Sequence, residues 1–156
     1  MIKKTSLPCI LLLLLLTLQG QQPAKKSAFR IVGYFSLKAK TADLKNIPFG
    51  RLTHINLYFL NPDTLGNFRP GLDSLIPFIR AAHENHVKLL VSIGGGGRHE
   101  YYHDLLKDGK RARLVNDLLQ IVLKYDLDGI DVDLEGSDID ENYENLAVDL
   151  AKAFKP

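Results

Sequence analysis

Apolar, β-branched segments alternate with amphipathic segments along the chain, and this alternation limits the possible folds more than any other feature. The strand-like segments span residues 30–37, 52–60, 87–97 and 127–135, and the amphipathic segments span residues 41–51, 72–86, 110–126 and 139–154. Repeated strand–helix units predict a parallel sheet with right-handed crossovers, which is an α/β architecture. A doubly wound sheet and a (β/α)8 barrel both satisfy the pattern.

Two of these segments carry residues that modify regular structure. Pro77 falls inside the segment 72–86, so we expect either a kink or a helix that begins near Ser74 with Pro77 in its first turn. The segment 87–97 is almost continuously apolar and ends in four glycines. Such a run is typical of a strand that is buried on both faces.

Composition and charge exclude several classes of function. The chain has 156 residues, of which 46% are hydrophobic and 24% charged, and this suits one globular domain. Its net charge of +2 is too small to favour nucleic acid or an anionic membrane as a partner.

The N-terminus has the layout of a secretory signal peptide. Lys3 and Lys4 precede an apolar run, residues 7–18, that is too short to span a bilayer, and a polar stretch follows it. We therefore expect a signal peptide over residues 1–20, a polar linker over residues 21–29 and one secreted domain over residues 30–156, with no stable membrane insertion after processing. A buried Leu-rich helix is the alternative. Cys9, the only cysteine, lies in the signal segment, which excludes an intramolecular disulfide or a thiolate metal site in the mature domain.

The segment "LDGIDVDLEG", residues 127–136, sets four acids among Leu, Ile and Val. Because side chains alternate along a strand, Asp131, Asp133 and Glu135 share one face, with neighbours roughly 6.5–7 Å apart. Three carboxylates on an interior face require a cation or shared protons. Glu135 lies nearest the carboxyl end of the strand, where ligands bind in parallel α/β folds, and is the natural proton donor.

Three other readings of the acidic segment stay open. A calcium loop of the EF-hand type is disfavoured, because Ile, Val and Leu stand where turn-forming residues are needed. A magnesium site on a strand needs only a few carboxylates and waters. An edge strand with an acidic solvent face is the third reading, and Asp128-Gly129 is compatible with a simple tight turn.

The segment "SIGGGG", residues 92–97, raises the question of a phosphate site. It lacks the Lys-Ser/Thr pair of a P-loop, and His99 stands where a dinucleotide-binding loop needs glycine. We expect the glycines to keep the strand end slim, so that a ligand such as a sugar can approach the backbone. The five histidines show no metal-ligand spacing and are expected to be structural or solvated.

These two motifs resemble glycoside hydrolase family 18, the chitinases and endo-β-N-acetylglucosaminidases. "DGIDVDLE" fits the family's D-x-x-D-x-D-x-E signature, and "SIGG" fits its S-x-G-G motif on the third barrel strand. The resemblance begins near Arg30 and runs to the end of the chain. It implies a (β/α)8 TIM barrel of which this chain holds the first four β/α units, with the C-terminal half-barrel missing. It also implies substrate-assisted, retaining hydrolysis of a glycan that contains β-linked N-acetylglucosamine, without a cofactor or metal.

The resemblance also implies roles for individual residues. Glu135 would protonate the glycosidic oxygen and later activate water, and Asp133 would orient the 2-acetamido group. Asp131 would share a proton with Asp133, and Asp128 would support the base of the strand. The residues implied on the substrate-binding side are Tyr34, Ser92, Gly94 and Gly95.

The sequence departs from the family pattern after its glutamate. Gly136 and Ser137 follow Glu135 where the family often has Tyr-Pro or another aromatic residue. The tyrosine and tryptophan of the family's later strands have no counterpart. A non-catalytic carbohydrate-binding relative and an inactive truncated product are the competing hypotheses, and an intact Glu135 argues against the first.

Overall fold

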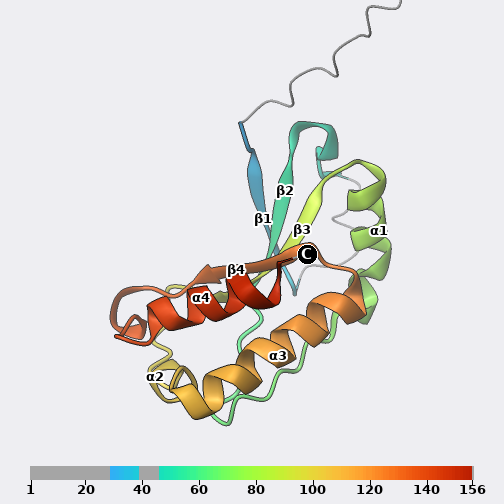
Figure 1. Ribbon diagram of the computed structural model, residues 1–156. Helices are drawn as coiled ribbons and strands as arrows, with labels where there is room; N and C mark the ends of the chain where they lie inside the picture. The colour runs from blue at the N-terminus through green and yellow to red at the C-terminus, as the bar shows by residue number, and fades with distance from the viewer. Residues whose placement is uncertain (1–28, 39–45, 156) are drawn as a thin grey trace, which may run out of the picture.

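The computed structural model describes residues 29–38 and 46–155, which form a four-stranded parallel sheet with helices packed against it (Figure 1). The strands are β1 (Val32–Ser36), β2 (His54–Tyr58), β3 (Lys88–Gly94) and β4 (Gly129–Asp133). They lie in the order β1-β2-β3-β4, and every neighbouring pair is parallel. A doubly wound sheet reverses its strand order at a switch point, whereas a barrel wall keeps sequential order. The observed order therefore identifies half of a (β/α)8 barrel.

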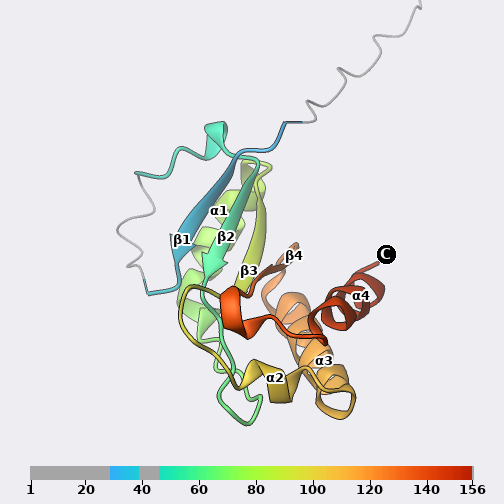
Figure 2. The same cartoon turned by 90° about the vertical axis from the view of Figure 1, so that its left-hand side faces the viewer.

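Helices connect the strands and follow β4. They are η2 (Phe49–Arg51), η3 (Leu72–Leu75), α1 (Ile76–Glu84), α2 (Tyr102–Leu105), α3 (Asp108–Tyr125), η4 (Gly136–Asp138) and α4 (Tyr143–Ala153), where η denotes a 3-10 helix. Figure 2 shows α1 behind the first three strands and α3 and α4 on one side of β4.

Pro77 lies in the first turn of α1, which confirms the second of the two alternatives for this helix. The proline ring is tolerated there because the first amides of a helix have no intrahelical acceptor. The last helix begins at Tyr143, later than the predicted start at residue 139, because residues 139–142 form a loop and a turn. The 3-10 helix η4 was not predicted. The short helix α2 was not predicted.

The core lies between the sheet and its helices. From the sheet, Ile55, Leu57, Leu89 and Val91 pack against α1 and the end of α3, whereas Ile93 and Leu134 pack against α3 and α4. The opposite face presents Tyr34, Asn56, Ser92 and Asp131, and within the described residues no helix covers it. We call this the inner face. β3 is buried on both faces toward its carboxyl end, as its apolar run predicted, since Ser92 on the inner face is fully buried.

Several predicted features lie outside the described residues. They include the signal segment, most of the linker, Cys9 and much of the first amphipathic segment. Within residues 29–38 and 46–155 no helix is both long and apolar enough to cross a membrane. The peptide bond between Tyr58 and Phe59 is cis.

Candidate active site

Three acids emerge on the inner face at the carboxyl end of β4. Asp131 and Asp133 lie opposite Ser92 and Gly94 of β3, and the alternate residues Ile130 and Val132 face the helices. Glu135 follows the strand and is exposed. The predicted shared face is therefore observed, because extended backbone continues past the last strand residue to the N-cap of η4.

The Asp131 carboxylate is held by hydroxyl groups from two other strands. Ser92 Oγ donates to Asp131 Oδ2 at 2.7 Å, and the Tyr34 hydroxyl approaches the same oxygen at 3.5 Å. Three strand spacings, about 14 Å in a flat sheet, separate β1 from β4. A tyrosine side chain from β1 reaches Asp131 because the sheet curls and makes the inner face concave.

No hydrogen bond joins Asp131 to Asp133 among the described residues, so the shared proton stays a prediction. In the same part of the chain, neither the Asp133 nor the Glu135 carboxylate has a protein hydrogen-bond or ion-pair partner. Both are available to a ligand. No group of three or more His, Cys, Asp or Glu side chains is arranged to hold a metal ion in the portion that the structure describes.

The glycine run packs against β4 and the loop after β2. Gly94 and Gly95 both have φ of +96°, which favours glycine. A Cβ on Gly94 would lie 2.5 Å from the Asp133 carbonyl oxygen, and one on Gly95 would lie 2.5 Å from the Phe59 ring. The close neighbours of these two glycines are therefore protein atoms, not the open space for a ligand that we expected. A Cβ on Gly96 would lie 3.7 Å from Glu135 Oε2, an ordinary contact distance.

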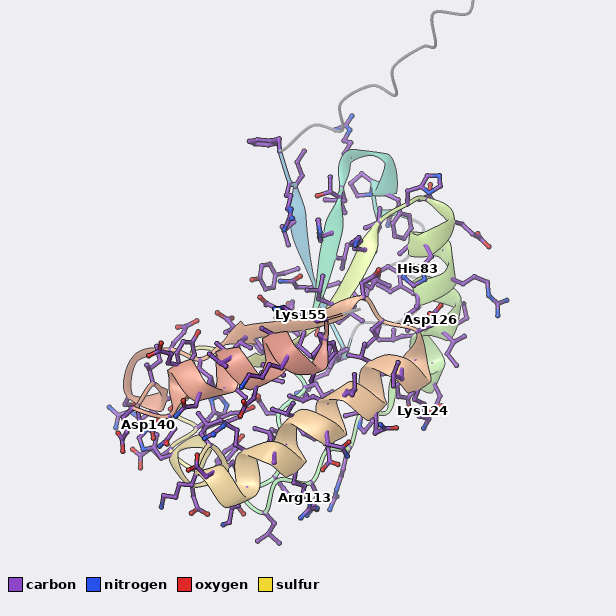
Figure 3. The ribbon with its side chains drawn as sticks, viewed as in Figure 1. His83, Arg113, Lys124, Asp126, Asp140 and Lys155 are labelled. Carbon is purple, nitrogen blue, oxygen red and sulfur yellow. The ribbon has the colours of Figure 1, made fainter. Side chains whose placement is uncertain are left out.

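Asp128 lies at the opposite end of β4 from Glu135. Its Oδ2 accepts hydrogen bonds from the Leu89 amide at 2.8 Å and from His83 Nε2 at 2.9 Å. His83 Nδ1 also lies 3.6 Å from Asp126 Oδ2, and Figure 3 shows these two residues where α1 meets the end of α3. Asp128 therefore joins the base of β4 to β3 and α1, apart from the other three acids.

Sequence reasoning missed aromatic residues beside the acids. The ring centroid of Tyr58, the last residue of β2, lies 6.2 Å from that of Tyr34 and 5.3 Å from that of Phe59. A groove of about 350 Å³ opens at the carboxyl ends of β1 and β2. It is lined by Ser36, Leu37, Lys38, Tyr58, Phe59 and Asn61. Side-chain alternation in β2 could have assigned Tyr58 to the inner face, since Asn56 and Tyr58 are two residues apart.

Comparison with known proteins agrees with this geometry. The profile of "Glycosyl hydrolases family 18" matches residues 30–156. A "chitinase-like effector" of Moniliophthora roreri is 33% identical over 132 residues, which cover 80% of this chain and 32% of that protein. A class V chitinase of Medicago truncatula is 30% identical over 104 residues, which cover 62% of this chain and 27% of that protein.

The fold matches solved chitinases over part of their length. The crystal structure of a family 18 chitinase from the chitin utilization locus of Flavobacterium johnsoniae superposes with a TM-score of 0.67 and 29% identity. The match covers 80% of this chain and 42% of that one. The match thus spans about a quarter to a third of the length of these curated relatives and less than half of the solved enzyme. The chain is a member of glycosyl hydrolases family 18 that holds the first half of the family's barrel.

Proposed function

We propose that the chain carries the acid-bearing half of a glycoside hydrolase site that acts on β-linked N-acetylglucosamine polymers or glycans. The observation that carries this proposal is the row of Asp131, Asp133 and Glu135 on the inner face, ending in an exposed glutamate at the carboxyl edge of the barrel. Ligands bind at that edge in parallel barrels. The kinship with chitinases supports the choice of substrate class.

In this proposal Glu135 is the general acid. It protonates the glycosidic oxygen while the carbonyl oxygen of the substrate's own 2-acetamido group attacks the anomeric carbon, so that the leaving alcohol departs with the proton. The resulting oxazolinium ion is then opened by water, whose proton returns to Glu135. Asp133 orients the acetamido group and stabilises its developing positive charge. Substrate assistance explains how one acid suffices where most glycosidases use two carboxylates.

The hydroxyl contacts of Asp131 suggest a supporting part for this residue. Hydrogen bonds from Ser92 and Tyr34 keep Asp131 on the inner face, two residues before Asp133 on the strand. The Tyr34 hydroxyl approaches Asp131, the Tyr58 ring lies beside the Tyr34 ring, and both rings could offer apolar faces to a sugar ring. The groove between β1 and β2 is the adjoining subsite in this proposal.

We further propose that the protein is secreted. The basic start and short apolar run of residues 1–20 support export, and the polymers that such an enzyme would cleave lie outside the cell.

A second candidate function is non-catalytic glycan binding. The kinship with a chitinase-like effector favours it. The two functions differ at Glu135, which only hydrolysis needs as an acid.

A fluorogenic chitobiose substrate separates these alternatives. The 156-residue chain alone is expected to hydrolyse little or none of it, because its described residues supply only four strands of a (β/α)8 barrel. In a completed barrel, Glu135→Gln should abolish hydrolysis and leave binding of chitooligosaccharides in place. Near wild-type hydrolysis by Glu135→Gln would refute the assignment of the acid, and binding without hydrolysis by the unsubstituted completed barrel would favour the second function.

A further inference from the structure

A hydrogen-bond network that the proposed chemistry does not use lies beneath the glycine run. At its centre is Asn61, in the loop after β2. Asn61 Oδ1 accepts from the Gly94 amide at 2.6 Å and from the Tyr102 hydroxyl at 2.8 Å, and Asn61 Nδ2 donates to the Gly94 carbonyl oxygen at 2.8 Å. Burial raises the pKa of Tyr102, which keeps its phenol a donor. The Gly94 amide can only donate, so it fixes which end of the Asn61 amide faces β3.

The second amide proton of Asn61 points to a histidine. Asn61 Nδ2 lies 3.3 Å from His99 Nε2, and His99 Nδ1 lies 3.1 Å from Asp138 Oδ2. Because Asn61 Nδ2 has no lone pair to offer, His99 Nε2 must be the acceptor and Nδ1 must carry the proton. The four hydrogen-bonding positions of the Asn61 side chain are then all used.

Asp138 anchors the far end of this network in η4, the helix that follows Glu135. Its side chain is only 1% exposed, and it accepts from the His99 amide at 2.8 Å as well as from the ring. A buried carboxylate is costly unless donors surround it, so these two bonds hold η4 in place. The Asp138 amide in turn donates to the Glu135 carbonyl oxygen at 3.0 Å.

We propose that Asn61, His99 and Asp138 are positioning residues for the acid Glu135. We call the hydrogen-bonded chain of these three side chains the relay. At one end Asn61 fixes Gly94, which begins the glycine run beside the Glu135 carboxylate. At the other end Asp138 fixes η4, the helix turn that follows Glu135. The acid is thereby held between two segments joined through one neutral imidazole. The role of Glu135 in this inference rests on the proposed function, whereas the relay itself is supported by the hydrogen-bond distances alone.

Nuclear magnetic resonance of the full, isotope-labelled chain tests the relay without relying on hydrolysis. At pH 7, long-range ¹H–¹⁵N spectra should show His99 protonated at Nδ1 and not at Nε2. In Asp138→Asn an amide donor faces Nδ1, so the proton should move to Nε2, where it meets the donor of Asn61. The Gly94 amide should then exchange with solvent about 10- to 100-fold faster, and the carboxyl ¹³C resonance of Glu135 should shift.

Asp140→Asn is the matched control, since the Asp140 carboxylate also accepts a backbone amide and a side-chain donor, but within the described residues both belong to Asn142. Figure 3 shows Asp140 at the turn before α4. This control should leave the His99 tautomer, the Gly94 amide and the Glu135 carboxyl unchanged.

If Asp138→Asn fails to fold, His99→Asn replaces it. Its Nδ2 can take the place of His99 Nδ1 and donate to Asp138, but its side chain is too short to place an acceptor where His99 Nε2 meets Asn61. The Gly94 amide should therefore loosen while the Asp138 amide stays protected. A proton on Nε2 in the wild type would overturn the relay, as would an unchanged Gly94 amide in whichever variant folds. If Asp138→Asn changes the His99 tautomer and the Gly94 exchange rate as expected but leaves the Glu135 carboxyl ¹³C resonance unchanged, the positioning role is overturned. If the relay passes these tests but the unsubstituted completed barrel does not hydrolyse the chitobiose substrate, the result counts against the proposed function alone.

Discussion

Replacing Gly94 by alanine tests why the glycine run follows β3. Gly94 has φ of +96°, and a Cβ there would lie 2.5 Å from the Asp133 carbonyl oxygen and 2.6 Å from its carbonyl carbon. Both contacts are with backbone, so no side-chain rotation can relieve them. The neighbouring strand or the glycine run itself must move.

Two terms set the size of the effect. A non-glycine residue at positive φ costs about 1–2 kcal/mol, and forcing an extra carbon into a packed site costs about 1–3 kcal/mol. Together they predict that Gly94→Ala lowers the free energy of unfolding by about 2–5 kcal/mol.

Gly96→Ala is the internal control, because the structure gives it no left-handed φ and its nearest contact would be 3.7 Å from Glu135 Oε2. At a compatible position this substitution is neutral or stabilises by up to about 1 kcal/mol through the unfolded state. Urea denaturation of both variants, followed by circular dichroism, gives the two values with a common baseline. Equal stabilities for the two variants would refute the reasoning and would return the glycines to the role of leaving space for a ligand.

The remaining predictions concern polar contacts away from the inner face. Asp128→Ala should lower the free energy of unfolding by about 1–3 kcal/mol, because it leaves the Leu89 amide and the His83 imidazole without their acceptor. Asp126→Asn should change the free energy of unfolding by about 0.5 kcal/mol or less, because the native side chain is 94% exposed. Urea melts of the pair check this, and comparable losses would contradict it. The hydrogen bond from Arg111 lowers the pKa of Asp149 below its ordinary 3.8, so the stability lost in Arg111→Gln should be largest above that value and should shrink as pH falls through the lowered pKa. Denaturation at pH 6 and pH 3 measures the difference, and a gap that does not narrow would exclude this ion pair as its source.

Much of the site was predictable from local pattern. The two-residue period of a strand assigned Asp131 and Asp133 to the face away from the helices, and Pro77 marked the first turn of α1. Both depend on a few consecutive residues, so short-range geometry was sufficient. The separation of Asp128 from Glu135 also follows from chain geometry, since seven residues of extended strand span about 23 Å.

Other features depended on contacts between distant segments. The alternation predicted four strands but not their sequential order, because barrel and doubly wound sheets both satisfy it. The resemblance to family 18 predicted the barrel, and the observed order β1-β2-β3-β4 agrees with that prediction. His99 was expected to be structural or solvated, and its pairing with Asp138, 39 residues away, appears only when η4 folds back over the glycine run. The short helices α2 and η4 carry no strong periodicity and lie outside every predicted segment.

The sequence by itself determined the α/β class, the face on which the acids lie and the family, because these depend on residue spacing along single elements. Only the tertiary structure decided what the acids and glycines contact. Tyr34 reaches Asp131 across 97 residues because the sheet curls, and Gly94 must be glycine because the backbone of β4 passes where a side chain would begin. Such contacts are set by the curvature and register of neighbouring strands, which no single segment encodes.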